Sequence, residues 1–202
     1  MLKHRARGFT LIELMVTLTI AAFLLLMAVP SFSSWMANAK VRSVAEEVQN
    51  GLRLAQTEAI RRNRQTVFAL TSATPAQNAT PVKNGRNWYV QVLMLTGSAE
   101  TNSDTDKGFF VQGSNYATSA TVTVTGPALL CFGSLGSATM TSAATALASC
   151  STTTPSASAV TYTIASTTAD RPMGIVVTPG GQVRMCDTLK TLSSSNPDGC
   201  PS

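Results

Sequence analysis

Residues 9–29 read FTLIELMVTLTIAAFLLLMAV and contain one charged side chain, Glu13. As an α-helix, this run of 21 residues would extend roughly 30 Å, the thickness of the hydrocarbon core of a bilayer. The segment before it is basic, and the cytoplasmic flanks of membrane spans are rich in Lys and Arg. The pattern therefore predicts a membrane-spanning helix, with the chain after Pro30 on the far side of the membrane.

Glu13 is the feature of this run that needs an explanation. An ionised carboxylate inside hydrocarbon costs several kcal/mol unless another group neutralises it. A cleaved secretory signal would also have a basic start and an apolar stretch, but normally a shorter one that ends in small residues. Ala28 offers only a weak site of that kind. Neither a secretory signal nor a plain signal-anchor helix accounts for Glu13, which is therefore a functional candidate.

Residues 8–13, GFTLIE, follow a short basic leader and resemble the processing motif of type IV prepilins. The resemblance implies that prepilin peptidase cleaves after Gly8 and that Phe9 becomes the N-methylated N-terminus. It also implies that Glu13 is the acidic residue that pilins use in assembly and that Pro30 is their helix-kinking proline. Physically, the ammonium of a cleaved Phe9 can pair with Glu13 of a neighbouring subunit in low dielectric.

The same resemblance implies partners and a location. The partners would be prepilin peptidase, other major and minor pilins or pseudopilins, and the inner-membrane assembly platform. The chain would be a single-pass protein of the bacterial inner membrane with its head in the periplasm, and later part of a pilus or pseudopilus filament. The resemblance implies no cofactor.

Residues 30–64 predict an amphipathic helix. Apolar side chains recur there at steps of three and four residues, with charged and amide side chains between them. Together with residues 9–29 this makes a rod of roughly 80 Å, whose second half packs against the protein's own head. Arg61, Arg62 and Arg64 cluster at its end, where they could complement the helix dipole or bind an anionic partner. The apolar positions are Val41, Val44, Ala45, Val48, Leu52, Ala55 and Ala59.

Residues 65–202 predict an all-β head, because β-branched and aromatic runs alternate with Gly and Pro. The fold class is therefore α+β and pilin-like, with a long N-terminal helix packed on a C-terminal β head. Residues 71–86 and 97–107 are polar, and residues 134–159 are mostly Ser, Thr, Ala and Gly, which predicts a mobile surface loop anchored at Cys150. The expected strands are residues 65–70, 87–95, 109–112, 121–125, 128–132, 160–164, 174–178 and 182–185.

Composition argues against an enzyme. The chain has 202 residues, is 12% charged and carries a net charge of +5, and its one histidine, His4, lies in the predicted leader. A mature protein without histidine has no Ser-His-Asp or Cys-His catalytic set and lacks most transition-metal sites. Removing the first eight residues also lowers the net charge to +2, which gives no global argument for nucleic-acid binding.

The four cysteines lack the close paired spacing of a zinc site and predict two disulfides in an oxidising compartment. Four cysteines allow three connectivities, and sequence proximity favours pairing the first with the second and the third with the fourth. On the loop-entropy model, a bridge across the terminal loop contributes about 3 kcal/mol. The residues are Cys131, Cys150, Cys186 and Cys200.

The end of the chain refines the resemblance. Residues 56–63, QTEAIRRN, and residues 181–187, GQVRMCD, resemble the minor pilins and pseudopilins called FimT, FimU and GspH. Members used in DNA uptake carry Gly-Arg-x-Arg here, whereas residues 181–184 of this chain lack the first arginine. Arg184 and Lys190 are then the only candidate DNA-binding cations of the tail, and DNA affinity without base reading depends on many such contacts.

Four regions and one leading function follow. Residues 1–8 form the leader, 9–29 the membrane and filament-core helix, 30–64 the amphipathic helix and 65–202 the head. We expect a non-enzymatic minor pilin of a type IV pilus, similar to FimU and FimT. The alternatives are a pseudopilin of a type II secretion system, similar to GspH, and a DNA-binding minor pilin for natural transformation.

Overall fold

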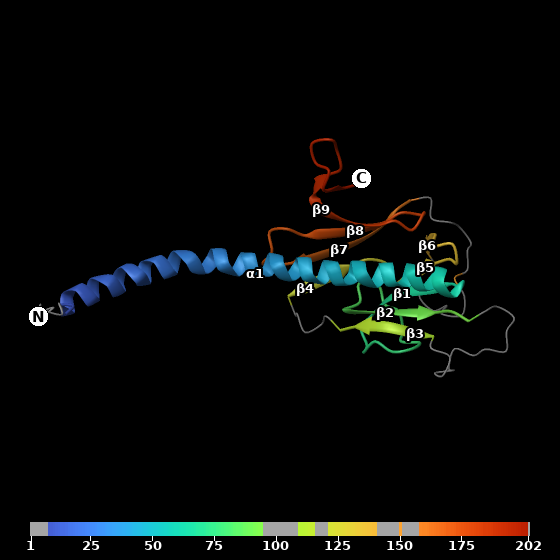
Figure 1. Ribbon diagram of the computed structural model, residues 1–202, viewed down its shortest axis with the longest axis horizontal. Helices are drawn as coiled ribbons and strands as arrows, with labels where there is room; N and C mark the ends of the chain where they lie inside the picture. Colours follow the sequence, from blue (N-terminus) through green and yellow to red (C-terminus); the bar gives the residue numbers. More distant parts are fainter. Residues whose placement is uncertain (1–7, 95–108, 116–120, 141–149, 151–157, 202) are drawn as a thin grey trace, which may run out of the picture.

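The computed structural model describes residues 8–94, 109–115, 121–140, 150 and 158–201, without the side chains of residues 27–31 and 140. Its described part consists of one long helix and a β-rich head. Figure 1 shows the first half of the helix projecting from the head and the second half lying across it. This arrangement confirms the predicted α+β, pilin-like fold class.

Helix α1 (Leu11–Arg62) is continuous and includes Pro30, so the predicted membrane and amphipathic segments form one element. It ends at Asn63, which adopts the left-handed conformation (φ 51°) that commonly terminates helices. The backbone N–H of Asn63 bonds to carbonyls of the last turn. The kink expected at Pro30 stays a prediction.

Five antiparallel strands form the first sheet. Strand β1 is central, and all six of its residues are buried because the sheet is covered on both faces. The strand order is β3-β2-β1-β5-β6. The bounds are β1 (Thr66–Thr71), β2 (Asn87–Val92), β3 (Phe110–Ser114), β5 (Leu129–Phe132) and β6 (Ala138–Met140).

The second sheet also has five strands, in the order β10-β9-β8-β7-β4. All neighbouring pairs are antiparallel except β9 and β10, which run parallel. The predicted hairpin at residues 174–185 is confirmed as β8 and β9. The bounds are β4 (Val122–Thr125), β7 (Val160–Ser166), β8 (Met173–Val177), β9 (Val183–Thr191) and β10 (Gly199–Cys200).

The main core lies where the buried stripe of α1 meets both sheets. In Figure 1 strands β1, β2 and β3 of the first sheet lie below α1, and strands β7, β8 and β9 of the second sheet lie above it; strands of both sheets contact the helix. Phe68 stacks on Trp88 with ring centroids 5.6 Å apart, and its edge meets Tyr162 of the second sheet at 5.7 Å. Gly51 of α1 permits this packing, because a Cβ there would stand 2.9 Å from both Phe68 and Trp88. The seven apolar positions predicted for this stripe are all buried.

Three sequence-based expectations about the head were wrong. Residues 138–140 fall in the predicted mobile loop but form strand β6. The chain turns at residues 133–137 after β5, so that residues 138–140 pair with β5. Strand β9 continues to Thr191 instead of ending at residue 185, and Gly199–Cys200 pairs with it as β10. Most of the predicted loop at 134–159, and the predicted loop at 97–107, lie outside the described residues.

Candidate functional site

The predicted processing site lies in an exposed, non-helical stretch just before α1. A Cβ added to Gly8 would have no atom within 4 Å beyond its chain neighbours, and the side chain of Phe9 is 81% exposed. An endopeptidase needs an extended and accessible peptide bond. Gly8 and Phe9 are both accessible, and cleavage between them stays a prediction.

Thr10 and Glu13 form the start of α1. Thr10 is the N-cap residue, with φ −82° and ψ 151°, and its Oγ1 accepts a hydrogen bond from the backbone N–H of Glu13 at 3.3 Å. Glu13 therefore occupies the third helical position, and Thr-x-x-Glu is the spacing of a capping box. A carboxylate in the first turn also interacts favourably with the helix dipole. Sequence reasoning missed this local role, although the spacing of Thr10 and Glu13 would have indicated it.

The first half of α1 presents apolar side chains that nothing in the described chain covers. All side chains of residues 9–26 are exposed, and the large apolar ones among them are 51–81% exposed. A contiguous apolar surface of this size marks an interaction site. Glu13 is its only charged residue. Within the described part of the chain, no helix combines the length and the apolar character that crossing a membrane requires.

The basic cluster at the other end of α1 is paired inside the chain. Glu58, only 8% exposed, accepts hydrogen bonds from Arg61 at 2.7 and 3.0 Å and from Arg62 at 2.8 Å. The hydrogen bond from Arg61 lowers the pKa of Glu58 below its usual value. The Arg64 guanidinium lies 5.8 Å from the centre of the Phe109 ring. These contacts favour a structural role for the three arginines over the binding of an anionic partner.

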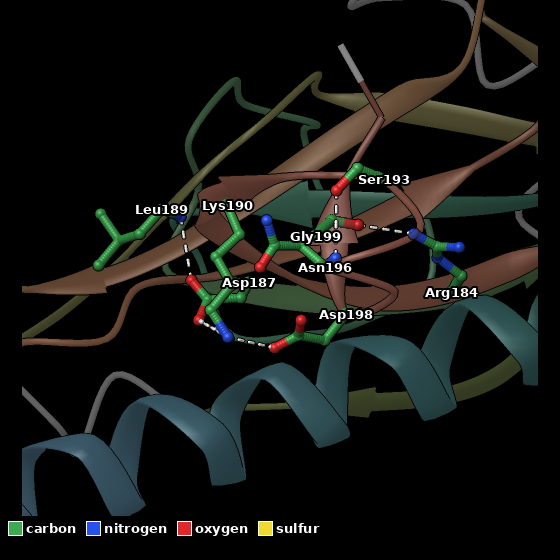
Figure 2. Close-up of polar contacts among 8 residues, drawn as sticks. All are labelled: Arg184, Asp187, Leu189, Lys190, Ser193, Asn196, Asp198 and Gly199. Atoms are coloured by element: carbon green, nitrogen blue, oxygen red, sulfur yellow. Dashed lines mark hydrogen bonds and ion pairs between the residues drawn. The ribbon is translucent and has the colours of Figure 1, made fainter.

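Both candidate DNA-binding cations are engaged in the C-terminal loop (Figure 2). Nη2 of Arg184 donates to the backbone oxygen of Gly199 at 2.6 Å. Nζ of Lys190 donates to Asp198 at 2.6 Å and lies 3.9 Å from Asp187. The hydrogen bond from Lys190 lowers the pKa of Asp198. Both side chains therefore hold the loop in its fold, and neither extends freely from the surface as part of a phosphate-binding patch.

Each sheet of the head carries one disulfide. The Cys131–Cys150 bridge ties Cys150 to β5, on the face of the first sheet that is turned away from α1. The Cys186–Cys200 bridge joins β9 to β10 and closes the C-terminal loop. This is the pairing that sequence proximity favours.

The turn between β8 and β9 needs a glycine at position 181. Its φ is +86°, and a Cβ there would stand 1.9 Å from the carbonyl oxygen of Gly136. The same oxygen accepts a hydrogen bond from Gln56 of α1 at 3.0 Å. Arg53, one turn earlier, donates to the carbonyl of Val183 at 3.4 Å. The Gly-x-Val-Arg stretch thus joins the helix to turns of both sheets, a role that sequence reasoning did not assign to it.

The family of this chain follows from its head and the second half of its helix. A family model described as Type II transport protein GspH matches residues 44–181, which is more than half of the chain and includes β1 to β8. The chain belongs to the GspH family. A second model, described as the prokaryotic N-terminal methylation motif, matches residues 3–29 of this GspH-family chain. The two matches confirm the resemblance to prepilins drawn from residues 8–13 and the resemblance to the GspH group that residues 56–63 indicated, and they identify a pilin-like subunit.

Two solved structures are similar to this GspH-family chain, both of the type IV minor pilin FimU of Pseudomonas aeruginosa strain PAO1. The P21 crystal form is 16% identical, has a TM-score of 0.48 and covers 73% of this chain and 88% of FimU. The P65 form is 15% identical, has a TM-score of 0.45 and covers 71% and 90%. So distant a likeness implies nothing about function. No curated protein matches the chain significantly.

Proposed function

We propose that this GspH-family chain is a minor pilin of a type IV pilus, a non-enzymatic subunit that acts by assembling into a filament. Prepilin peptidase removes residues 1–8, and the same enzyme methylates the new N-terminus at Phe9. The first half of α1 then rests in the inner membrane, with the head in the periplasm. The assembly platform transfers this half of the helix into the filament core, where it packs against other pilins.

The exposed first half of α1 is the observation that carries this proposal. The head buries the stripe from Val41 to Ala59 and leaves the apolar side chains of residues 9–26 without a partner. Burying apolar surface is favourable by about 25 cal/mol per Å², so this segment is stable only against lipid or other apolar helices. A membrane and a filament core each supply such surroundings in turn. The methylation motif at residues 3–29 supports processing ahead of this step.

Glu13 would select the register of packing. A lone carboxylate in an apolar environment is costly, whereas a carboxylate beside an ammonium recovers part of that cost. Cleavage after Gly8 creates one ammonium per subunit at Phe9, four residues before the acid. Pairing of Glu13 with Phe9 of a neighbouring subunit satisfies both charges and sets the axial offset between the two helices.

A pseudopilin of a type II secretion system is the second candidate. The description of the matched family, a type II transport protein, is the observation that favours it. Both candidates share the processing step and the filament core. Deleting the gene separates them, because loss of twitching or transformation identifies a pilus subunit and loss of exoprotein export identifies a pseudopilin.

The proposal predicts that Glu13→Ala chains are processed and reach the membrane but are strongly depleted from sheared filaments. Thr17→Ala is the matched control, because it removes a polar group from the same exposed segment one turn further on without changing the charge. Immunoblots of membrane and filament fractions measure both. Normal amounts of Glu13→Ala chain in filaments would contradict the role of Glu13. Retention of residues 1–8 on the finished protein, seen by mass spectrometry, would contradict the proposal as a whole.

A further inference from the structure

Helix α1 carries an exposed aromatic pair between its apolar first half and the head. Phe32 and Trp35 are 60% and 64% exposed, and their ring centroids lie 5.9 Å apart. Tryptophan is enriched at membrane–water interfaces, because its ring suits the acyl boundary while its indole N–H reaches polar headgroups. The pair is therefore a candidate for contact with the surface of a lipid bilayer.

The position of Trp35 along the chain matches the level of such a surface. Residues 14–39 contain no Asp, Glu, Lys or Arg, and Lys40 is the first cation after this stretch. At a rise of 1.5 Å per residue, Trp35 lies roughly 39 Å from Phe9 along the helix. A bilayer measures about 30 Å across its hydrocarbon and about 40–45 Å with its headgroups. With Phe9 at one surface, Trp35 is level with the headgroups of the other, and the exposed Lys40 stands just beyond them.

The head begins directly beyond this level. Oδ1 of Asn38 accepts hydrogen bonds from the backbone N–H groups of Asp170 at 2.9 Å and of Arg171 at 3.1 Å. These two bonds hold the turn between β7 and β8 against α1, one helical turn after Trp35. Figure 1 shows this turn at the end of the head from which the first half of the helix projects. The depth of Trp35 therefore also fixes the height of this turn.

A groove opens at the same level, between α1 and the second sheet, and has a volume of about 560 Å³. Trp35 and Ala39 line it from the helix, and Met173 and Met185 line it from β8 and β9. Methionine side chains adapt their shape to irregular apolar neighbours. The base of the head thus continues the apolar surface of the helix instead of interrupting it.

The charged side chains around the groove are balanced and already paired. Arg42 bonds to Glu46 at 3.0 Å. Asp198 bonds to Lys190 at 2.6 Å and also interacts with the charge of Arg171. A balanced surface suits a layer of zwitterionic headgroups, whereas attraction to an anionic membrane needs a cluster of cations. The cations at the groove and its partners are Arg42, Arg171 and Lys190, and the anions are Glu46, Asp187 and Asp198.

We propose that the base of the head is a lipid-docking surface, made of Phe32, Trp35, Lys40 and the turn at residues 167–172, which rests on the zwitterionic headgroup layer. The two rings enter the boundary between headgroups and acyl chains, and the balanced charges lie among the headgroups. The inference rests on the proposed function and adds how the subunit is held before assembly. Trp35 sets the depth of the helix, Asn38 transmits it to the head, and the head meets the assembly platform in one orientation.

Tryptophan fluorescence of the full-length chain in vesicles tests the depth of Trp35. The chain has two tryptophans, and Trp88 is buried in the core, so that Trp35 is the one exposed to lipid. Vesicles of phosphatidylcholine carry a nitroxide either on the headgroup or near the end of the acyl chain. We expect the headgroup label to quench Trp35 about twofold more strongly than the deep label. Trp35→Phe keeps an aromatic ring and should remove this quenching, which leaves the emission of Trp88 as the internal reference.

A dye on the head tests whether the turn between β7 and β8 also meets the lipid. All four cysteines are in disulfides, so a single added cysteine can be labelled by itself. Thr168→Cys places the dye on the exposed turn, and Leu135→Cys is the matched control. Leu135 is 91% exposed, and its neighbour Gly136 packs near Ile60, roughly 33 Å along α1 from position 38. We expect the headgroup nitroxide to quench the dye at 168 about twofold and to leave the dye at 135 unchanged.

Asn38→Ala tests how the helix and the head are coupled. Removing the side-chain oxygen that holds Asp170 and Arg171 should lower the quenching at position 168 and leave the quenching of Trp35 as it was. Unchanged quenching at 168 in this variant would overturn the coupling role of Asn38.

Five results would overturn the docking surface itself: stronger quenching of Trp35 by the deep label, equal quenching in the parent and Trp35→Phe, equal quenching at 168 and 135, quenching that requires anionic lipid, or shielding of Trp35 from aqueous iodide that appears only at a high ratio of protein to lipid. The last result would assign the surface to a second copy of the chain. The filament assay of Glu13→Ala separates these failures from failure of the proposed function. If Glu13→Ala chains are depleted from filaments while Trp35 stays in water, the function stands and the docking surface does not.

Discussion

Replacement of Gly181 by alanine should destabilise the head more than its small size suggests. A φ of +86° is unfavourable for an L-residue by about 1–2 kcal/mol. The added Cβ would also stand 1.9 Å from the oxygen of Gly136 and 2.4 Å from Nε2 of Gln56, so the turn must move away from α1. That movement breaks the hydrogen bond from Gln56 to Gly136, which contributes about 1 kcal/mol. Together we expect a loss of about 3 kcal/mol.

Gly180 provides the matched control at the adjacent position. A Cβ at Gly180 would meet no atom closer than Oγ1 of Thr178 at 3.9 Å, and its φ is not positive. Gly180→Ala should therefore change the free energy of unfolding by no more than about 0.5 kcal/mol. Urea denaturation of the two full-length variants in detergent, with the disulfides intact, measures the difference. The reasoning would be refuted if the losses in free energy of unfolding for Gly181→Ala and Gly180→Ala agreed within about 1 kcal/mol, because Gly181→Ala would then behave like an unstrained surface substitution.

Two further predictions concern the charged pair at the end of α1 and the terminal disulfide. The pKa of Glu58 is lowered in the folded chain, chiefly by its hydrogen bond from Arg61. The carboxylate of Glu58 therefore stabilises the fold above pH 4.5, and this stabilisation is lost as the pH falls through the lowered pKa. Glu58→Gln should therefore lower the stability at pH 7 and make the stability depend less on pH below 4.5. Urea midpoints of the variant that fall with decreasing pH as steeply as those of the parent chain would contradict this. Removing the terminal disulfide with the double variant Cys186→Ala and Cys200→Ala should cost about 3 kcal/mol on the loop-entropy model. Denaturation midpoints measured without reductant check this, and a variant as stable as the oxidised parent would speak against it.

The division into a rod and a head was predictable because its signals are local. The spacing of apolar residues between Val41 and Ala59 predicts both the helix and the face of it that is buried, and the structure buries that face. Most strands were also predictable from β-branched and aromatic runs. Strand β6 was not, because its residues, Ala138–Met140, have weak strand preference and are ordered by pairing with β5. The same holds for β10, which contains only Gly199 and Cys200.

The candidate site divides in the same way. The sequence by itself determined the apolar segment, its single acid Glu13 and the motif at residues 8–13, because covalent order alone places these groups together. Only the tertiary structure decided that Arg184 and Lys190 are held within the C-terminal loop, that Gly181 must be a glycine, and that Trp35 lines a groove with β8 and β9. The physical reason is that each of these depends on contacts that only the folded chain creates. The contacts of Arg184 and Lys190 form when the chain after β9 returns through β10, and those of Gly181 and Trp35 form when α1 packs against the sheets.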